Sequence, residues 1–158
     1  MFLLILITLL FFILLVSYVS YRLAFYAPKR LSEGEVSMPV GEQYEAHRPG
    51  ISKSVEEMLA RSFEAVTIVS HDGKQLYARY YHVADDAPLQ IFFHGYKSHA
   101  ELDCCGGSKL ANKLGQNTLV VDQPSHGKSE GSSITFGIKE RRDCLCWINY
   151  ARMRFGEN

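Results

Sequence analysis

The sequence predicts an α/β domain that is preceded by a membrane-spanning helix. Three observations support this fold class: an uncharged apolar segment opens the chain, an Asp-Gly hairpin follows a linker, and apolar strands then alternate with helices. Such alternation is typical of a parallel sheet covered by helices. We expect the 158 residues to divide into a transmembrane helix over 1–26, a linker over 27–52 and an α/β domain over 53–158.

The composition excludes several other classes of protein. Hydrophobic residues make up 47% of the chain and charged residues 22%, which is ordinary for a folded protein and argues against disorder. The 17 basic and 17 acidic residues give a net charge of zero, so no basic surface indicates a nucleic-acid partner. The expected macromolecular partner is the lipid bilayer, through residues 1–26.

The first 21 residues form the candidate membrane span. They contain no charged residue, and as a helix they extend over roughly 30 Å, the thickness of the hydrocarbon core of a bilayer. Tyr18, Tyr21 and Tyr26 lie where an aromatic belt is expected. A cleaved signal peptide is the main alternative, but the sequence lacks its basic start and its small-x-small cleavage site. A buried helix of a soluble protein is disfavoured by the length of the apolar run. We therefore expect a single-pass membrane protein.

The basic residues after the span predict its orientation. Arg22, Lys29 and Arg30 follow it, and the positive-inside rule places such a segment in the cytoplasm. The domain is therefore expected to be cytoplasmic.

The four cysteines agree with a reducing compartment. The adjacent pair Cys104-Cys105 and the spaced pair Cys144-x-Cys146 do not resemble a disulfide framework. Neither pair presents a tetrahedral set of ligands. We interpret the cysteines as small buried hydrophobic side chains, and we expect neither a metal nor a cofactor.

The domain is predicted to begin with a helix and a hairpin. A short helical pattern covers 54–61. The runs 64–70 and 75–83 have the composition of strands, and the Asp72-Gly73 turn between them is a typical hairpin signal.

Two strand–helix units follow the hairpin. The strands are the short apolar runs 89–93 and 118–122, and the helices are predicted over 98–114 and 135–155. A Ser98-x-x-Glu101 capping box is expected to begin the first helix. The predicted apolar stripes are Leu102, Cys105, Leu110 and Leu114 on the first helix and Ile138, Leu145 and Ile148 on the second.

The first candidate site follows the strand over 89–93. In open α/β sheets the chemistry lies at the carboxyl ends of the strands, and this strand runs into His94-Gly95-Tyr96-Lys97-Ser98. A glycine after an apolar strand permits a sharp turn, and backbone N–H groups at the start of the next helix can hold an anion. A plain strand-to-helix turn is the alternative.

A literal G-x-S-x-G motif, Gly127-x-Ser129-x-Gly131, lies in the loop after the second strand. A nucleophile elbow places its serine directly between a strand and a helix, whereas this strand ends several residues earlier, near Asp122. A phosphate-binding loop is also disfavoured, because it requires a glycine at the position of Asp122. We interpret the segment as a structural loop whose polar residues satisfy its own backbone. A Rossmann-like nucleotide site is disfavoured as well, because no G-x-G-x-x-G follows a strand.

Together the two strand ends resemble the α/β-hydrolase superfamily. Leu89-Gln-Ile-Phe-Phe-His-Gly-Tyr96 is similar to the family's strand that ends in His-Gly before its first helix, and Leu119-Val-Val-Asp-Gln-x-x-His-Gly-Lys-Ser-Glu-Gly131 is similar to its next strand and loop. The resemblance covers 63–158 and extends to bacterial members with an N-terminal membrane helix. It implies the N-terminal portion of a hydrolase sheet, in which an antiparallel hairpin is followed by a parallel β-α-β-α unit.

The resemblance also assigns a role to Tyr96. Its backbone N–H, in a loop with His94 and Gly95, corresponds to an oxyanion-hole donor, which stabilises the negative oxygen of a tetrahedral intermediate. His94 itself is expected to be structural. Pro124 and Ser125 stand where relatives often carry Arg and then Gly or Ala, so no role of that arginine is carried over.

The implied enzyme is a serine hydrolase, but the resemblance covers only part of one. In the family the nucleophile, the acid and the catalytic histidine follow the helix that is predicted over 135–155. None of the three has a counterpart here. We therefore expect a partial domain, inactive alone, of an enzyme that hydrolyses an ester, thioester, amide or peptide. The alternative is a complete non-catalytic half-domain that acts as a membrane-tethered binding or dimerisation module.

The missing half has a physical consequence. In the family's strand order, the strand over 89–93 pairs with the nucleophile strand. Without that neighbour its apolar edge is exposed, and such an edge is a predicted aggregation site. We expect the isolated segment 31–158 to be poorly soluble or partly molten.

Overall fold

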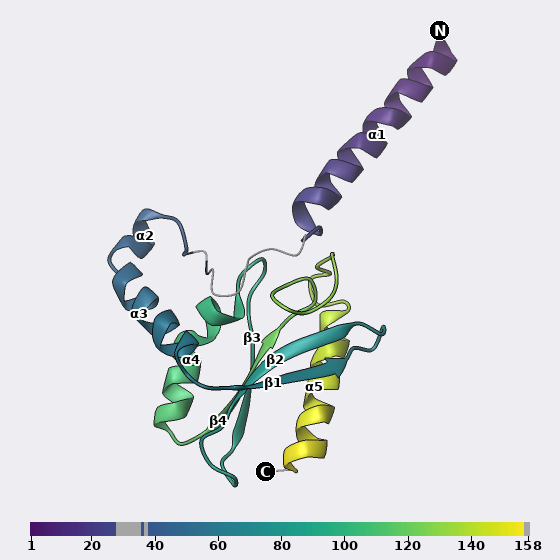
Figure 1. Cartoon of the computed structure of the whole chain (residues 1–158). Coiled ribbons are helices and arrows are strands. Elements are labelled where there is room, and N and C mark those ends of the chain that lie inside the picture. The colour runs from purple at the N-terminus through teal and green to yellow at the C-terminus, as the bar shows by residue number, and fades with distance from the viewer. Residues whose placement is uncertain (28–35, 37, 157–158) are drawn as a thin grey trace.

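The structure, a computed structural model, describes residues 1–27, 36 and 38–156 (Figure 1). A long helix leads into a small domain in which one sheet lies between helices. The elements are α1 (Phe2–Ala24), α2 (Glu42–Glu45), α3 (Arg48–Leu59), β1 (Glu64–Val69), β2 (Gln75–Tyr81), β3 (Leu89–Phe93), α4 (Ala100–Lys113), β4 (Asn117–Asp122) and α5 (Glu140–Phe155).

The sheet has the predicted combination of an antiparallel hairpin and a parallel pair. Its order is β1-β2-β4-β3, with β1 and β4 antiparallel to β2 and with β3 parallel to β4. The hairpin turns at Gly73, whose φ of 86° suits glycine. Every residue of β4 is buried, as expected for a strand with a neighbour on each side and helices over both faces.

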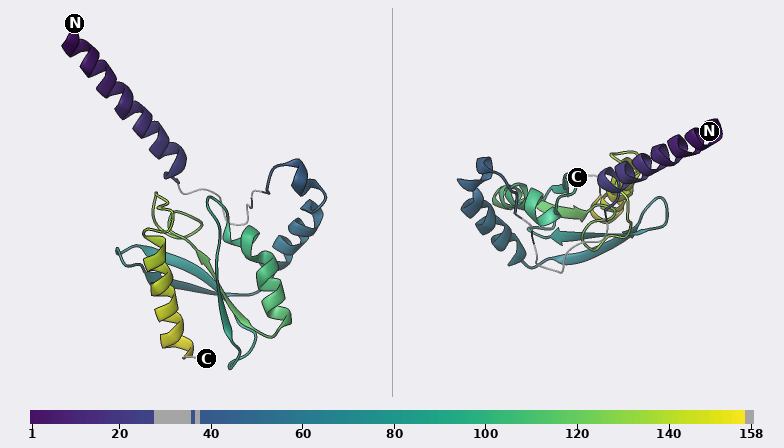
Figure 2. Two further views of the ribbon diagram at one scale, coloured as in Figure 1. Left: turned by 180° about the vertical axis from the view of Figure 1, so that it is seen from behind. Right: turned by 90° about the horizontal axis from the view of Figure 1, so that it is seen from above.

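Helices cover both faces of the sheet. Figures 1 and 2 show α3 and α4 on one side and α5 on the other. Alternate residues of β4 serve the two cores: Val120 packs with residues of α3 and α4, whereas Leu119 and Val121 pack with Trp147 of α5. The fold is therefore an α/β sandwich of three layers.

The start predicted for the first domain helix is wrong. Helix α3 begins at Arg48 rather than near residue 54, with a proline in its first turn, where the missing N–H is tolerated. Together with α2, it makes the last part of the predicted linker helical. Residues 28–35 and 37 of that linker, with Lys29 and Arg30, lie outside the described residues.

The predicted capping box of α4 is wrong. His99 is the N-cap, and it makes no side-chain cap hydrogen bond. The Ser98 hydroxyl instead donates to Asp103, and Glu101 pairs with the buried guanidinium of Arg79 at 2.5 Å. Of the two side chains that the local pattern assigned to a cap, Glu101 therefore pairs with the sheet and Ser98 bonds within the first turn of α4.

The apolar stripe predicted for α4 is wrong in part. Leu110 and Leu114 are exposed, whereas the face on the sheet consists of Ala100, Cys104, Cys105, Ser108 and Ala111. Small residues face the sheet because the helix approaches it closely: a Cβ added to Gly107 would lie 2.6 Å from Cε1 of Phe92.

Helix α5 also differs from its prediction. It begins at Glu140 rather than 135, because the Glu140 carboxylate accepts hydrogen bonds from both the N–H and the hydroxyl of Thr135, which shapes the preceding turn. The predicted stripe of Ile138, Leu145 and Ile148 is exposed, and the fully buried residue is Trp147. The helix ends at Phe155, and Gly156 follows as its C-cap, as predicted.

The cysteines are free thiols. Cys104 and Cys105 are buried, while Cys144 and Cys146 are half-buried. Burial raises the pKa of Cys104 to about 12, so this thiol stays protonated and unreactive at neutral pH.

Strand β3 lies at the edge of the sheet. Among the described residues its only neighbour is β4, so its other side is open, as predicted. Leu89 and Ile91 line a groove of about 270 Å³ there, together with Ile148 of α5.

Helix α1 is long and apolar enough to cross a membrane, although a signal sequence meets the same criterion. The rest of the described chain buries none of its residues. Figure 1 shows the helix projecting away from the domain.

Candidate functional site

The candidate site lies where β3 and β4 end. These strands are parallel, so their carboxyl ends meet at one edge of the sheet, below the loops 94–99 and 123–139. A pocket of about 190 Å³ opens there. Its walls come from three stretches of chain: His94, Gly95 and Tyr96, then Gln123, Pro124 and His126, and then Ile134, Phe136, Gly137 and Glu140.

His94 joins two of these loops. Its Nδ1 lies 2.9 Å from the carbonyl oxygen of Gly95, and its Nε2 lies 3.1 Å from the backbone N–H of Gln123. The Gln123 side chain in turn donates to the His94 carbonyl. Burial lowers the pKa of His94, so the ring is neutral, with a proton on Nδ1 and an acceptor at Nε2. Both ring nitrogens of His94 are therefore hydrogen-bonded to backbone groups of the two loops.

Asp103 holds the loop after β3 from the first turn of α4. Its carboxylate accepts hydrogen bonds from the Gly95 N–H and the Ser98 hydroxyl, each at 2.6 Å. The Gly95 N–H is therefore occupied, whereas the Tyr96 N–H makes no hydrogen bond to any described residue. The structure places the predicted residues His94, Gly95 and Tyr96 together at the end of β3, in the wall of one pocket.

The Tyr96 side chain contacts the end of α1, which the sequence did not reveal. Its hydroxyl donates to the Ala24 carbonyl at 2.7 Å, and the neighbouring Lys97 ammonium donates to the Leu23 carbonyl. A donor with a positive charge suits the C-terminal end of a helix, where carbonyls lack partners. No local pattern could show contacts between residues more than 70 positions apart.

A short strand-like pairing joins α1 to the loop before α5. Tyr26 forms a bridge with Ser133, the Ala27 N–H donates to the Ser132 carbonyl at 3.1 Å, and the Ile134 N–H donates to the Phe25 carbonyl at 2.7 Å. Because Ile134 also lines the pocket, the end of α1 is fixed to the pocket wall.

Ser129 is structural, as predicted. It is fully buried; its hydroxyl accepts from the Tyr77 N–H at 2.8 Å and donates to the Asp122 carbonyl at 2.5 Å. The Lys128 N–H donates to the Asp122 carboxylate, so it does not face a phosphate. A Cβ on Gly127 would lie 2.1 Å from that carboxylate, which explains the glycine. The G-x-S-x-G motif therefore forms a structural loop whose hydrogen bonds go to its own backbone and to strand β2.

In the described chain three non-glycine residues, Lys97, Ser125 and Phe136, adopt positive φ, at 51°, 71° and 50°. Lys97 lies in the loop 94–99, and Ser125 and Phe136 lie in the loop 123–139, both at this edge of the sheet. Positive φ outside glycine is strained, and such strain gathers at functional sites.

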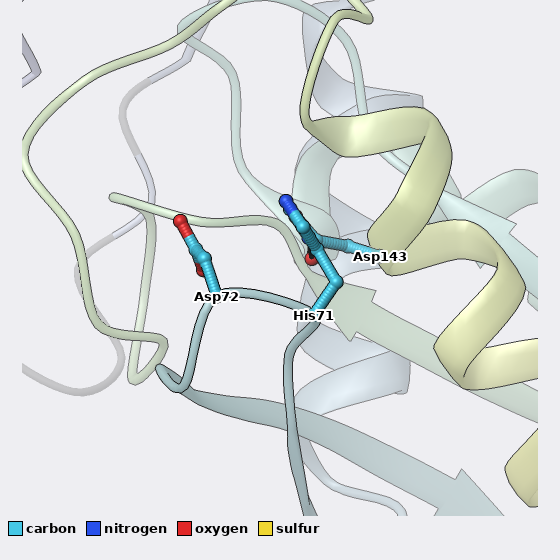
Figure 3. Close-up of side chains that lie close together, drawn as sticks. All are labelled: His71, Asp72 and Asp143. Atoms are coloured by element: carbon cyan, nitrogen blue, oxygen red, sulfur yellow. Dashed lines mark hydrogen bonds and ion pairs between the residues drawn. The ribbon is translucent and has the colours of Figure 1, made fainter.

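A second cluster of titratable groups, His71, Asp72 and Asp143, lies at the hairpin turn (Figure 3). His71 Nδ1 lies 2.8 Å from the buried Asp143 carboxylate on α5. Asp72 pairs with the ammonium groups of Lys74 and Lys139, and its hydrogen bond from Lys74 lowers its pKa. These ammonium groups supply the charge that a metal would bring, so the cluster fits a polar tie between hairpin and helix.

No model of a known protein family and no curated protein matches the sequence. Solved structures do match. An esterase of Pyrococcus furiosus, Pf2001, is 25% identical over 63% of this chain and 40% of its own, with a TM-score of 0.57. Est1E of Butyrivibrio proteoclasticus, with ferulic acid bound, is 27% identical over 60% of this chain and 39% of its own, with a TM-score of 0.54.

In each case the match covers less than half of the esterase. In a second crystal form of Pf2001, 84% of this chain matches 42% of that one at 22% identity, with a TM-score of 0.59. The mixed sheet, its strand order and these partial matches lead to one conclusion. The chain has the fold of the N-terminal half of an α/β hydrolase, preceded by an apolar helix.

Proposed function

We propose that this chain is the N-terminal part of a membrane-anchored serine hydrolase that cleaves an ester, thioester, amide or peptide. The observation that supports this function most directly is that Tyr96 lines the pocket at the end of β3 while its N–H makes no hydrogen bond to any described residue. In this proposal a Ser-His-Asp triad comes from the portion of the fold that this chain does not match.

The residues of this chain hold an oxyanion hole in position. The Tyr96 N–H donates to the oxygen that becomes negative as the substrate carbonyl turns tetrahedral. His94 and Asp103 fix the loop from two sides, so little reorganisation is needed as the charge develops. One such donor typically lowers the barrier by about 2.7–4 kcal/mol.

A non-catalytic role is the second candidate, and the open edge of β3 supports it. Its unpaired edge, with Leu89 and Ile91 in the adjoining groove, suits a partner strand or a second copy of the chain. In that case the protein is a membrane-tethered binding or dimerisation module.

One experiment separates the two roles. Native membranes are treated with a fluorophosphonate probe, and the protein is isolated with an antibody against the domain. We expect a labelled serine on a peptide that continues the reading frame beyond Asn158 or that belongs to a tightly bound second chain. An unlabelled species of 17.9 kDa, with a true stop codon in its transcript, contradicts the hydrolase proposal and favours the binding module.

A further inference from the structure

The end of α1 marks where the bilayer surface lies, if the helix spans as proposed. Tyr18 and Tyr21 occupy its last turns, and the Arg22 guanidinium lies 3.9 Å from the centre of the Tyr26 ring. Aromatic and basic side chains prefer the level of the lipid headgroups. Residues 21–26 are therefore placed at the interface between lipid and water.

The same residues touch the wall of the pocket. The Phe25 ring packs edge-on against Phe136, with 5.3 Å between their centres, and Phe136 stacks on Tyr96 at 4.9 Å. Both Phe136 and Tyr96 line the pocket. A continuous row of aromatic rings thus leads from the interface to Tyr96 in the pocket wall.

This row is exposed at the surface. Phe136 is 57% exposed and Tyr96 is 50% exposed, although both are large aromatic side chains. Phe136 is also held at positive φ, which costs backbone free energy that the ring does not recover by burial. An exposed aromatic row beside a membrane helix suits insertion among lipid chains rather than contact with water.

From this geometry we infer that the pocket takes its ligand from the bilayer, and that the ligand is an amphiphile with an acyl chain. The chain lies along Phe25, Phe136 and Tyr96, and its carbonyl reaches the Tyr96 N–H. The inference rests on the proposed membrane anchoring and on the proposed oxyanion role of Tyr96. It narrows the substrate class to lipid-like acyl compounds.

Photo-crosslinking in liposomes tests this inference with the full chain. The protein is reconstituted with a phosphatidylcholine that carries a diazirine in one acyl chain, irradiated and mapped by mass spectrometry. We expect crosslinks in α1 and also at Tyr96, Ile134 or Phe136. Leu114 serves as an internal control, because it is 63% exposed but lies at the far end of α4.

Two variants sharpen the test. Phe136→Asn removes the ring but keeps a residue that tolerates positive φ, and it should reduce crosslinking of the loops several-fold while α1 is labelled as before. Leu114→Ser should change neither the crosslinking of the loops nor the labelling of α1. Circular dichroism confirms that both variants retain the fold.

The outcomes distinguish the inference from the proposed function. If the chain does not float with liposomes, both the anchoring and the inference fail. If it floats but only α1 is labelled, the anchoring stands and the inference is overturned. Equal labelling of Leu114 and Phe136 also overturns it, because the lipid then binds any exposed apolar side chain.

Discussion

At the scale of single residues, the candidate site is built by side chains that bind backbone. His94 and Asp103 each hold the loop after β3, and neither has a ring nitrogen or carboxylate oxygen directed at a substrate in the described structure. In the proposed hydrolase, the Tyr96 N–H is the backbone donor that would serve the chemistry. The proposed catalytic role of Tyr96 therefore belongs to its main chain, whereas its ring contacts α1 and Phe136.

Replacing that donor should slow catalysis by the complete hydrolase. Tyr96→Pro removes the N–H, and we expect kcat to fall by roughly 10²–10³-fold. Tyr96→Ala keeps the N–H and should lose far less. Steady-state kinetics with an ester substrate measure the difference, and thermal unfolding of both variants controls for loss of the fold. Equal losses in the two variants would rule out a backbone role.

The two histidines of the site should make stability depend on pH. The rings of His94 and His126 lie 4.6 Å apart, and burial lowers the pKa of both; the neighbouring His94 further lowers that of His126. Below about pH 6.5 the unfolded chain binds protons at these histidines that the folded chain does not bind. The free energy of unfolding that the two neutral histidines contribute is therefore fully present above this pH and is lost as the pH falls below it.

Urea unfolding in detergent at pH 7.5, 6.5 and 5.5 measures this loss of unfolding free energy. These values span about two pH units around the ordinary pKa of histidine. The double variant His94→Gln/His126→Gln should be less stable but should show a flatter dependence on pH. Parallel profiles for the two proteins would show that other groups cause the effect.

At the scale of elements, the packing of α4 on the sheet depends on its glycines. Gly107→Ala places a Cβ 2.6 Å from Phe92, so we expect destabilisation by about 1–3 kcal/mol, reduced by the better helix propensity of alanine. The adjacent Gly106 meets no atom within 4 Å, and Gly106→Ala should stabilise by up to about 1 kcal/mol. Chemical unfolding should show a lower free energy of unfolding for Gly107→Ala and a higher one for Gly106→Ala. Changes of the same sign would contradict this packing.

The positions of the strands along the chain could be predicted from the sequence, because the signals for a hairpin and for a buried strand are local. Asp72-Gly73 specifies the hairpin, and the apolar runs of β3 and β4 are short and bounded by polar turns. The buried faces of the helices were harder to predict. Leu110 and Leu145 are apolar yet exposed, because small residues and Trp147 fit the space on the sheet better.

The site was predictable only in part, because some of its residues are adjacent in the chain and others are distant. His94, Gly95 and Tyr96 follow one another along the chain, so their position at the end of a strand was visible in the sequence. Asp103 and Phe136 reach the site through folding, from a helix and from a distant loop. Contacts of this kind carry no local pattern.

At the scale of the whole molecule, we expect the open edge of β3 to limit solubility. Segment 31–158, expressed without α1, should form oligomers that bind an amyloid dye, because the apolar edge strand can pair with another copy. Leu89→Lys places a charge in the open groove and should reduce this association. Light scattering measures it, and a cooperative, monomeric melt of the unmodified segment would contradict the prediction.

If α1 spans a bilayer as proposed, the joint between α1 and the domain would couple the protein to the physical state of its membrane. At 1.5 Å per residue, the 23-residue helix is about 34 Å long, slightly longer than a bilayer core of about 30 Å, so it would span that core with some tilt. The pairing of Tyr26 with Ser133 ties the domain to that tilt. In a thicker bilayer the helix would be more upright, and the domain would rotate with the helix relative to the membrane plane. The depth of Phe136 should therefore change with lipid chain length, and the protein would sense the thickness of the membrane that holds it.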